Sequence, residues 1–359
     1  MTSDFLIIGG GIAGISAAAR LSALGRVTLC EQEPALGYHA SGRSAALFEP
    51  RYGKPAITAL SEAGDTFLRH ENGGVLSPRG FLMVAREDQR EGFLAEETAM
   101  RLDRIAPAEA CDIVPVLNPG KVALAAYHAA AWDIDTDRLI QNFAREARGN
   151  GAAILTGAPV TAISRTATGW RIGAGGETHD ARMIVNAAGP WADGIARMAG
   201  VRPVGLVPYR RSMARIPAPG GHDISRWPMI FGPGEDWYAR PDAGALLVSP
   251  GDEDPMEPHD AFADDMVLAA GLARYEAMVT EPVTRLLANW AGLRTFAPDR
   301  VLVIGPDRRE PAFFWLAGQG GYGFQTSPAA SRLAADLIAG RAPELGPAVV
   351  AALSPARFG

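Results

Sequence analysis

The stretch FLIIGGGIAG, residues 5–14, decides the fold of this chain. Residues 5–8 are a short apolar run, which is typical of a parallel strand buried on both faces. The pattern G-x-G-x-x-G follows at Gly9, Gly11 and Gly14. In a dinucleotide-binding fold the first glycine permits the tight turn, the second lets the backbone approach a pyrophosphate, and the third lets a helix lie close to a strand. A glycine-rich turn without a ligand is the alternative.

A helix and a second strand complete this unit. The sequence predicts a helix that ends near Leu24, and residues 27–30 form a second buried strand that ends at Glu31. Glu31 lies where a dinucleotide-binding fold places an acid to bind a pair of ribose hydroxyls. Because an acid at this position disfavours a phosphorylated ribose, FAD or NAD is favoured over NADP.

Two further segments favour FAD over NAD. Residues 38–46 are polar and end in small residues suited to a helix start, so their N–H groups could hold a second phosphate or flank a flavin. The alternative is a surface loop. Near the other end, a buried strand at 313–317 precedes a glycine-rich turn and a helix to about Ala339, with Ser327 as N-cap and Pro328 at its first position. The positive end of that helix would stabilise the negative charge of a reduced flavin.

Between these ends, nucleotide-binding pieces alternate with stretches of antiparallel character. The sequence predicts a helix that stops near residue 149, a small β meander over 160–172 and a buried strand at 183–186. The fold class is therefore α/β: a discontinuous Rossmann-like FAD-binding domain with an inserted α+β substrate domain built on an antiparallel sheet. The predicted boundaries are 1–75, 131–203 and 284–359 for the FAD-binding domain, and 76–130 and 204–283 for the substrate domain.

Composition narrows the class of protein. The 359 residues carry a formal net charge of −6, which gives no electrostatic reason to expect nucleic acid or anionic lipid as a partner. Two cysteines, without a Cys-x-x-Cys pair, argue against a disulfide framework and fit a reducing compartment. The sequence has no apolar stretch long enough to span a membrane and no metal-ligand spacing among its six histidines, and its first residues do not predict a secretory signal. We expect a cytoplasmic protein without a metal site, with peripheral membrane association left open.

With these segments in place, the sequence resembles the D-amino-acid oxidase superfamily of flavoproteins, in particular its FAD-dependent D-amino-acid dehydrogenase branch, which includes D-arginine dehydrogenase. The resemblance covers nearly the whole chain, in the order GGGIAG, GYHASGRSAA, LSPRG, DIDTD, VNAAGPWAD, RRS, WPM, RPDAG, WAGLR and FFWLAGQGGYGFQTS. It implies noncovalent FAD and oxidation of an amino acid, with preference for the D form, to its imino acid by hydride transfer from Cα to flavin N5. The electron acceptor would be a quinone, another carrier or O2.

The resemblance also implies which residues form the site. Arg211, Tyr238 and Arg294 would bind the substrate carboxylate, since the planar fork of arginine binds a carboxylate in a bidentate manner. Tyr52 would lie in a loop over the site, and Gln325 would contact the substrate and the cofactor edge. Without the resemblance, Arg211 is an ordinary surface residue and Tyr238 a strand residue that caps the core. The residues implied to contact FAD are Gly9, Gly11, Gly14, Glu31, Gln32, Ser41, Arg43, Ser44, Ala45, Val160, Ala188, Gly189, Trp191, Gly292, Arg294, Gly320, Gly321, Tyr322, Gly323 and Gln325.

The resemblance fails at the positions that would set substrate specificity. D-Arginine dehydrogenase has an acid after its SPR segment, where this chain has Phe81, and a histidine and a threonine where this chain has Leu47 and Glu49. Phe81 indicates a more apolar side-chain pocket, whereas Glu49 either faces the site and recognises a cationic substrate or points to solvent. The rival functions are an oxidase of glycine or secondary amines (sarcosine-like), an NADPH-dependent flavin hydroxylase and a flavin-bearing subunit of a larger complex.

Overall fold

The strand β1 (Ser3–Ile8) lies inside a parallel arrangement, with Ile7 in one hydrophobic cluster and Leu6 and Ile8 in another. In the computed structural model, which describes residues 2–359, it pairs in parallel with β2 (Val27–Cys30) and β12 (Glu177–Asn186). The strand β2 pairs in parallel with β9 (Ala153–Leu155), and β12 with β19 (Phe313–Ala317). In the strand order β9-β2-β1-β12-β19, the strands β2 and β9 lie on one side of β1, and the later strands β12 and β19 lie on the other side. The connections that leave β1 and β12 therefore run in opposite directions, which leaves a crevice at the carboxyl ends of these two strands.

The remaining strands of this sheet extend it on the side of β12. The strands β10 (Val160–Thr166) and β11 (Gly169–Ala174) form an antiparallel meander with β12, as the sequence predicts. The strand β18 (Val303–Pro306) pairs antiparallel with β19.

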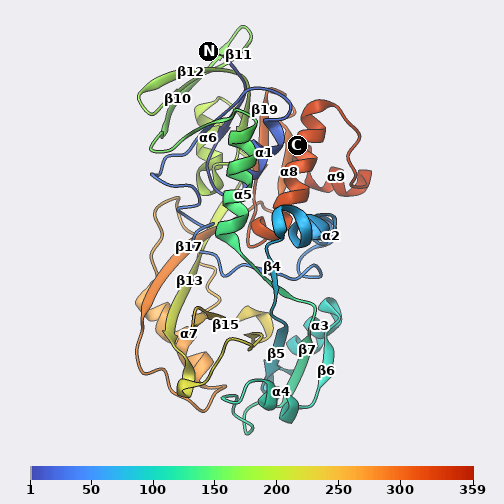
Figure 1. Ribbon diagram of the computed structural model, residues 1–359, viewed down its shortest axis with the longest axis vertical. Helices are drawn as coiled ribbons and strands as arrows, with labels where there is room; N and C mark the ends of the chain where they lie inside the picture. The colour runs from blue at the N-terminus through green and yellow to red at the C-terminus, as the bar shows by residue number, and fades with distance from the viewer. Residues whose placement is uncertain (1) are drawn as a thin grey trace.

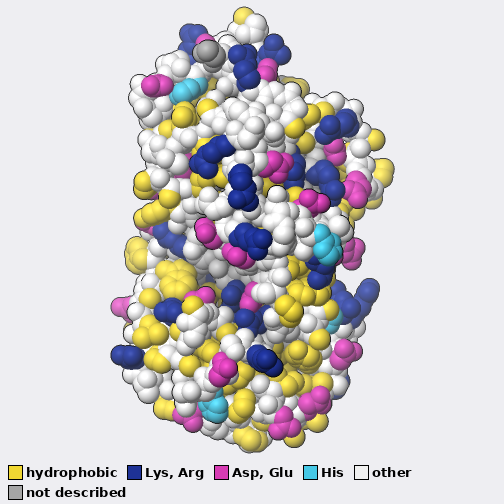
Figure 2. All heavy atoms as spheres, viewed as in Figure 1, with side chains coloured by type: hydrophobic (Ala, Val, Ile, Leu, Met, Phe, Trp, Pro, Cys, Tyr) yellow, Lys and Arg dark blue, Asp and Glu magenta, His cyan; other side chains and the backbone are white. Residues whose placement is uncertain are grey.

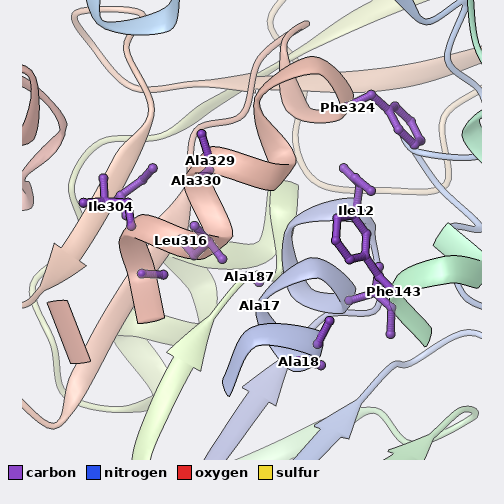
Figure 3. Close-up of a cluster of buried hydrophobic side chains, with 14 of the residues drawn as sticks. Ile12, Ala17, Ala18, Phe143, Ala187, Ile304, Leu316, Phe324, Ala329 and Ala330 are labelled. Atoms are coloured by element: carbon purple, nitrogen blue, oxygen red, sulfur yellow. The ribbon is translucent and has the colours of Figure 1, made fainter. Parts of the chain in front are cut away.

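Helices bury the faces of this first sheet. Their bounds are α1 (Ile12–Leu21), α2 (Pro55–His70), α5 (Thr136–Gly149), α6 (Ala192–Met198), α8 (Gly323–Ala339) and α9 (Pro347–Leu353). The helix α1 contacts both α5 and α8, and α2 contacts α8. Figure 3 shows the resulting core, in which Ile12 of α1, Phe143 of α5 and Ala329 of α8 belong to one cluster. Segments from both ends of the chain thus share one core.

A second sheet carries the other half of the molecule (Figure 1). Its order is β17 (Ala288–Phe296), β13 (Val207–Pro217), β16 (Ala245–Ser249), β15 (Tyr238–Asp242), β14 (Met229–Phe231), β5 (Phe81–Ala85), β7 (Leu124–His128) and β6 (Asp103–Ile105). The strands pair antiparallel except β14 and β5, which pair in parallel. The helices of this half are α3 (Arg90–Met100), α4 (Pro107–Ile113) and α7 (Asp265–Glu276).

A small third sheet, β3 (Leu47–Phe48), β8 (Trp132–Ile134) and β4 (Leu76–Pro78), completes the fold. The structure thereby confirms the predicted α/β class with a Rossmann-like part and a largely antiparallel second sheet. The exact domain boundaries stay a prediction. The strand β17, which falls within the predicted FAD-binding range 284–359, pairs with β13 in the second sheet.

Two predicted helix starts are wrong. The helix α8 begins at Gly323 rather than at Ser327, and Pro328 lies inside it. Because Pro328 lacks an N–H, the hydroxyl of Ser327 donates instead to the carbonyl of Phe324, at 2.9 Å. The second wrong start is the one expected in the 38–46 segment, because residues 44–46 are not helical and lead into β3. The end of the first helix also differs from the prediction, since α1 ends at Leu21 rather than near Leu24.

The visible surface of the molecule carries charges of both signs. Figure 2 shows Lys and Arg side chains interspersed with Asp and Glu over the visible face. Within residues 2–359, none of the helices combines the length and the apolar character that crossing a membrane requires.

Candidate functional site

Four adjoining hollows run from the carboxyl end of β1 to the second sheet. The nucleotide hollow, of about 320 Å³, is bounded by Gly9, Glu31 and Trp191. The central hollow, of about 130 Å³, shares Gly11, Ser41 and Gly189 with it. The side-chain hollow (about 240 Å³) and the mouth hollow (about 400 Å³) both share Arg294 and Gly321 with the central hollow. Together they form a continuous path of the size range that cofactor and substrate sites have.

The three glycines of the G-x-G-x-x-G motif are each needed for a different local reason. Gly9 has a φ of +106°, and a Cβ there would lie 2.4 Å from the carbonyl oxygen of Ala187. A Cβ on Gly14 would lie 1.9 Å from the oxygen of Gly9, so this glycine lets α1 lie against the strand. Gly11 differs, because its Cβ would meet only the Ser41 hydroxyl, at 3.2 Å, and it lines both inner hollows. The site of Gly11 is therefore open to a ligand, as the motif predicts.

The walls of the nucleotide hollow suit an ADP-type ligand. Glu31 is 7% exposed and lines the hollow, where its Oε2 accepts from the N–H of Gly10 at 2.5 Å. The helix α1 starts at this hollow, and its N-cap residue, Gly11, has no side chain that could cap the first N–H groups. The N–H of Ile12 donates to the Ser41 hydroxyl at 3.0 Å. A helix N-terminus beside a glycine turn is a ready site for a phosphate. The residues present therefore fit a dinucleotide.

The predicted cofactor-contacting residues lie together in space. All of them except Gly14 line one of the four hollows, and Tyr322 lines only the mouth hollow. Arg43 lines the central hollow, but its guanidinium donates to the carbonyl oxygens of Ala261 and Ala291, at 2.8 and 3.0 Å. Arg43 thus ties the 38–46 segment to the second half of the molecule.

Two arginines and two tyrosines meet where the central, side-chain and mouth hollows join. Arg211 and Arg294 come from the adjacent strands β13 and β17, and the Arg294 Nη2 lies 3.4 Å from the hydroxyl of Tyr238 on β15. At their centre is a residue that the sequence reasoning missed, Glu235. Its Oε2 accepts from the Arg211 Nη1 at 3.1 Å and lies 3.8 Å from the Arg294 Nη1, and its Oε1 accepts from the Tyr52 hydroxyl.

The electrostatics of this group stabilise the carboxylate of Glu235. Burial alone would raise the pKa of Glu235, but Arg294, Arg211 and the Tyr52 hydrogen bond together hold that pKa below its usual range. Burial, followed by the Glu235 charge, raises the pKa of Tyr52 well above normal, so its hydroxyl stays a donor. Arg211 also pairs with Glu253 at 3.1 Å, and its buried Nε has no acceptor among residues 2–359.

Gln325 connects the cofactor side to the loop that carries Tyr52. It lies near the start of α8 and is 3% exposed. Its Oε1 accepts from the N–H of Glu49 at 3.4 Å, and its Nε2 donates to the carbonyl of Tyr52 at 3.5 Å. This single side chain therefore touches both the predicted loop over the site and a predicted specificity residue.

All three predicted specificity residues, Leu47, Glu49 and Phe81, line the side-chain hollow. Glu49 is 2% exposed, so its side chain is buried beside the hollow and does not point to solvent. Burial raises the pKa of Glu49 to about 7. Phe81 is stacked on Phe231 with ring centroids 4.1 Å apart, so the predicted apolar wall is also present.

The sequence reasoning also missed Glu96, which lines the side-chain and mouth hollows and accepts from the N–H of Gly234 at 2.6 Å. The only signal for Glu235 was its place in a Pro-Gly-Glu-Asp turn directly before Trp237 and Tyr238. His39 packs in the 38–46 segment, where its Nε2 lies 2.9 Å from Glu33 and its ring is 4.8 Å from that of Trp191.

Known proteins resemble this chain in sequence and in fold. A family model described as FAD dependent oxidoreductase (DAO) matches residues 4–337. Glycine oxidase of Pseudomonas aeruginosa is 27% identical over 383 residues, which cover 97% of this chain and 98% of that protein. The structure of glycine oxidase from Geobacillus kaustophilus has a TM-score of 0.83 at 22% identity and covers 98% of each chain. L-alpha-glycerophosphate oxidase from Mycoplasma pneumoniae with FAD bound has a TM-score of 0.84 at 21% identity, covering 94% of this chain and 95% of that one.

Proposed function

This chain belongs to the FAD dependent oxidoreductase (DAO) family, and from that premise we propose that it oxidises an amino acid or amine at the C–H bond next to nitrogen. FAD, when bound, supplies the two-electron acceptor for that bond. The residues that would hold it are those of the nucleotide and central hollows, with Glu31 at the ribose and the backbone at Gly11 beside the diphosphate. The start of α8 would face the flavin.

One observation carries the proposal: two guanidinium groups and a phenol already converge on a single carboxylate. Tyr52 and Arg211 donate to Glu235, and Arg294 lies 3.8 Å away. Donors placed for one carboxylate can hold another, and an α-carboxylate held by Arg294 and Tyr238 would replace Glu235 there. The substrate that fits best is thus an amino acid, with its Cα turned toward the central hollow.

Each residue then has a defined task. Arg294 and Arg211 bind and orient the carboxylate, Tyr52 and Tyr238 donate further hydrogen bonds to it, and Gln325 holds the loop over the site. Fixing the substrate against the cofactor lowers the barrier because the reacting atoms no longer have to find each other. The D preference is proposed on the resemblance given above.

A glycine oxidase is the second candidate, because relatives of that name match the full length of this chain. The side-chain hollow of about 240 Å³ favours a substrate with a side chain over glycine itself. Peroxide formation with equal O2 uptake would distinguish an oxidase from a dehydrogenase that passes electrons to a quinone or another carrier.

The proposal is tested by mixing FAD-loaded protein, without oxygen, with D- and L-amino acids, glycine and secondary amines such as sarcosine. We expect the visible absorbance of the oxidised flavin to disappear with at least one amino acid that has a side chain. If every member of the panel leaves the flavin oxidised while dithionite reduces it, the proposed function is wrong. If only NADPH reduces it, the protein is a hydroxylase-type flavoprotein instead.

A further inference from the structure

The segment of residues 38–46 lies along both the nucleotide hollow and the central hollow. Its first residues line the nucleotide hollow and its last residues line the central hollow, with Ser41 in both. Since these two hollows would hold FAD, the segment would cover the cofactor along much of its length. Movement of this segment would therefore open both parts of the cofactor site at once.

The later part of this segment is held from the second sheet. The indole N–H of Trp290 donates to the carbonyl of Arg43 at 3.2 Å, and the Arg240 guanidinium donates to the carbonyl of Ala46 at 3.1 Å. Trp290 and Arg240 belong to β17 and β15, which lie in the lower half of the molecule in Figure 1. The half of the molecule that would bind the substrate thus also fixes a segment of the cofactor site.

The guanidinium of Arg43 makes three further contacts with the second half. Its Nη1 donates to the carbonyls of Ala261 and Ala291, at 2.8 and 3.0 Å, and its Nη2 donates to the carboxylate of Asp260. A hydrogen bond between two charged groups is about twice as strong as one between neutral groups. The guanidinium is therefore committed to the second half, although Arg43 also lines the central hollow.

Asp260 contacts three side chains of the segment. Besides the bond from Arg43, its Oδ2 accepts from the Tyr38 hydroxyl at 3.4 Å, and its Oδ1 lies 3.7 Å from the His39 Nδ1. Asp260 itself lines none of the four hollows. It therefore holds the segment from the outside, without a place at the cofactor.

The loop that carries Asp260, residues 250–264 between β16 and α7, is anchored to the second sheet. The N–H of Met256 donates to the carbonyl of Pro208 on β13 at 2.9 Å. Ala261 is 8% exposed and belongs to one hydrophobic cluster with Leu293 of β17. Because the loop is fixed on both sides of Asp260, it can oppose an outward movement of the segment.

We propose that Asp260 and Arg43 form a clasp that closes the 38–46 segment over the cofactor and so controls how fast FAD leaves the protein. Asp260 is a positioning residue, which acts through Arg43. The loop 250–264 of the second half thereby retains a cofactor that the first half binds. The inference goes beyond the proposed function, since it holds whichever substrate the protein oxidises. Arg43, which the resemblance implies as an FAD contact, serves mainly to hold the segment.

The test is the rate at which bound FAD exchanges with an excess of isotopically labelled FAD, measured on FAD-loaded protein recovered at timed intervals. Arg43→Met should speed the exchange about tenfold or more, because a charge-assisted hydrogen bond and two bonds to carbonyls are lost. Asp260→Asn should speed it about fivefold, the upper end for an exposed ion pair, and Asp260→Glu should restore most of the retention. The control is Asp180→Asn, which breaks the exposed pair with Arg171 and should leave the exchange rate unchanged.

The double variant distinguishes a clasp from a direct contact between Arg43 and FAD. If the two residues act together, Arg43→Met with Asp260→Asn should exchange FAD within about twofold of the rate of Arg43→Met alone. A wild-type rate in Asp260→Asn, or two effects that multiply in the double variant, would overturn the proposal, because Arg43 would then act on the cofactor by itself. Should Arg43→Met retain no FAD, Asp260→Asn and its Asp260→Glu counterpart decide the question.

The rate of global unfolding, followed in urea by far-UV circular dichroism, separates this role from general stabilisation of the fold. In Asp260→Asn the clasp predicts faster exchange of FAD at an unchanged unfolding rate. A purely structural ion pair would raise both rates by the same factor, and that result would also overturn the proposal.

Discussion

Replacing Arg294 by methionine should impair substrate oxidation while leaving the fold nearly intact. The Arg294 side chain is 24% exposed, lies 3.8 Å from Glu235 and has one long hydrogen bond of 3.4 Å, to Tyr238. Its removal therefore disturbs few internal contacts. Arg211 is a poorer choice, because its side chain is 6% exposed and holds two acids, so its loss would leave buried charges without partners.

The size of the effect follows from the bond that is lost. A hydrogen bond to a charged group contributes about 1.5–3 kcal/mol. Since about 1.4 kcal/mol corresponds to a factor of ten in rate, kcat/KM should fall about 10- to 150-fold. Arg294→Lys keeps the charge but not the planar fork, and its kcat/KM should lie between those of Arg294→Met and the wild type.

The assay is anaerobic reduction of the bound flavin by the best amino acid of the panel, with Arg171→Met as the control. Arg171 is an exposed arginine that pairs with Asp180 on the surface and lines none of the four hollows. An Arg294→Met protein that holds FAD normally and is reduced as readily as the wild type would refute the assignment of the carboxylate-binding group.

Three further predictions concern other parts of the site. Gly11→Val should give a folded protein with little or no bound FAD, because a Cβ there would meet only the Ser41 hydroxyl in the protein, while the added side chain would occupy the space proposed for the diphosphate; normal flavin content would contradict this. Glu235→Gln should bind acetate about tenfold more tightly than the wild type, since the charge that competes for Arg211 and Tyr52 is gone, and unchanged binding would show that Glu235 does not compete. Glu49→Gln should stabilise the protein at pH 8 but hardly at pH 5: an acid whose pKa rises from 4.5 to about 7 on folding loses stability as pH rises through that window, by at most about 3 kcal/mol. Urea unfolding at both pH values checks this, and an equal difference at pH 5 and 8 would contradict it.

The parallel core could be predicted from the sequence because its signals are local. The apolar runs at 5–8 and 27–30 and the glycines between them specify a strand, a turn and a helix within one short stretch. The individual glycine roles were also predictable, and the contacts of Gly9 and Gly14 agree with them. Local chemistry misled the prediction at Ser327 and Pro328, where a serine before a proline is typical of a helix start but here lies within α8.

The centre of the site could not be predicted in the same way. Glu235 meets Tyr52 and Arg211 across large separations in sequence, and it lies in a turn with a φ of +52°, which no pattern of apolar residues indicates. The orientation of Glu49 was open for a similar reason, because only the placement of β3 against β8 and the second sheet turns its carboxyl inward. Contacts made by tertiary structure, and not by neighbours in sequence, decide the chemistry here.

The central claim is that the site would hold the Cα–H bond of an amino acid against FAD, which, when bound, would accept the two electrons of that bond. Anaerobic flavin reduction should be measured with an amino acid that carries deuterium at Cα and with its unlabelled form. The account predicts slower reduction by the deuterated substrate, in the wild type and in Arg294→Met alike. Equal rates with both forms, at saturating substrate, would contradict it.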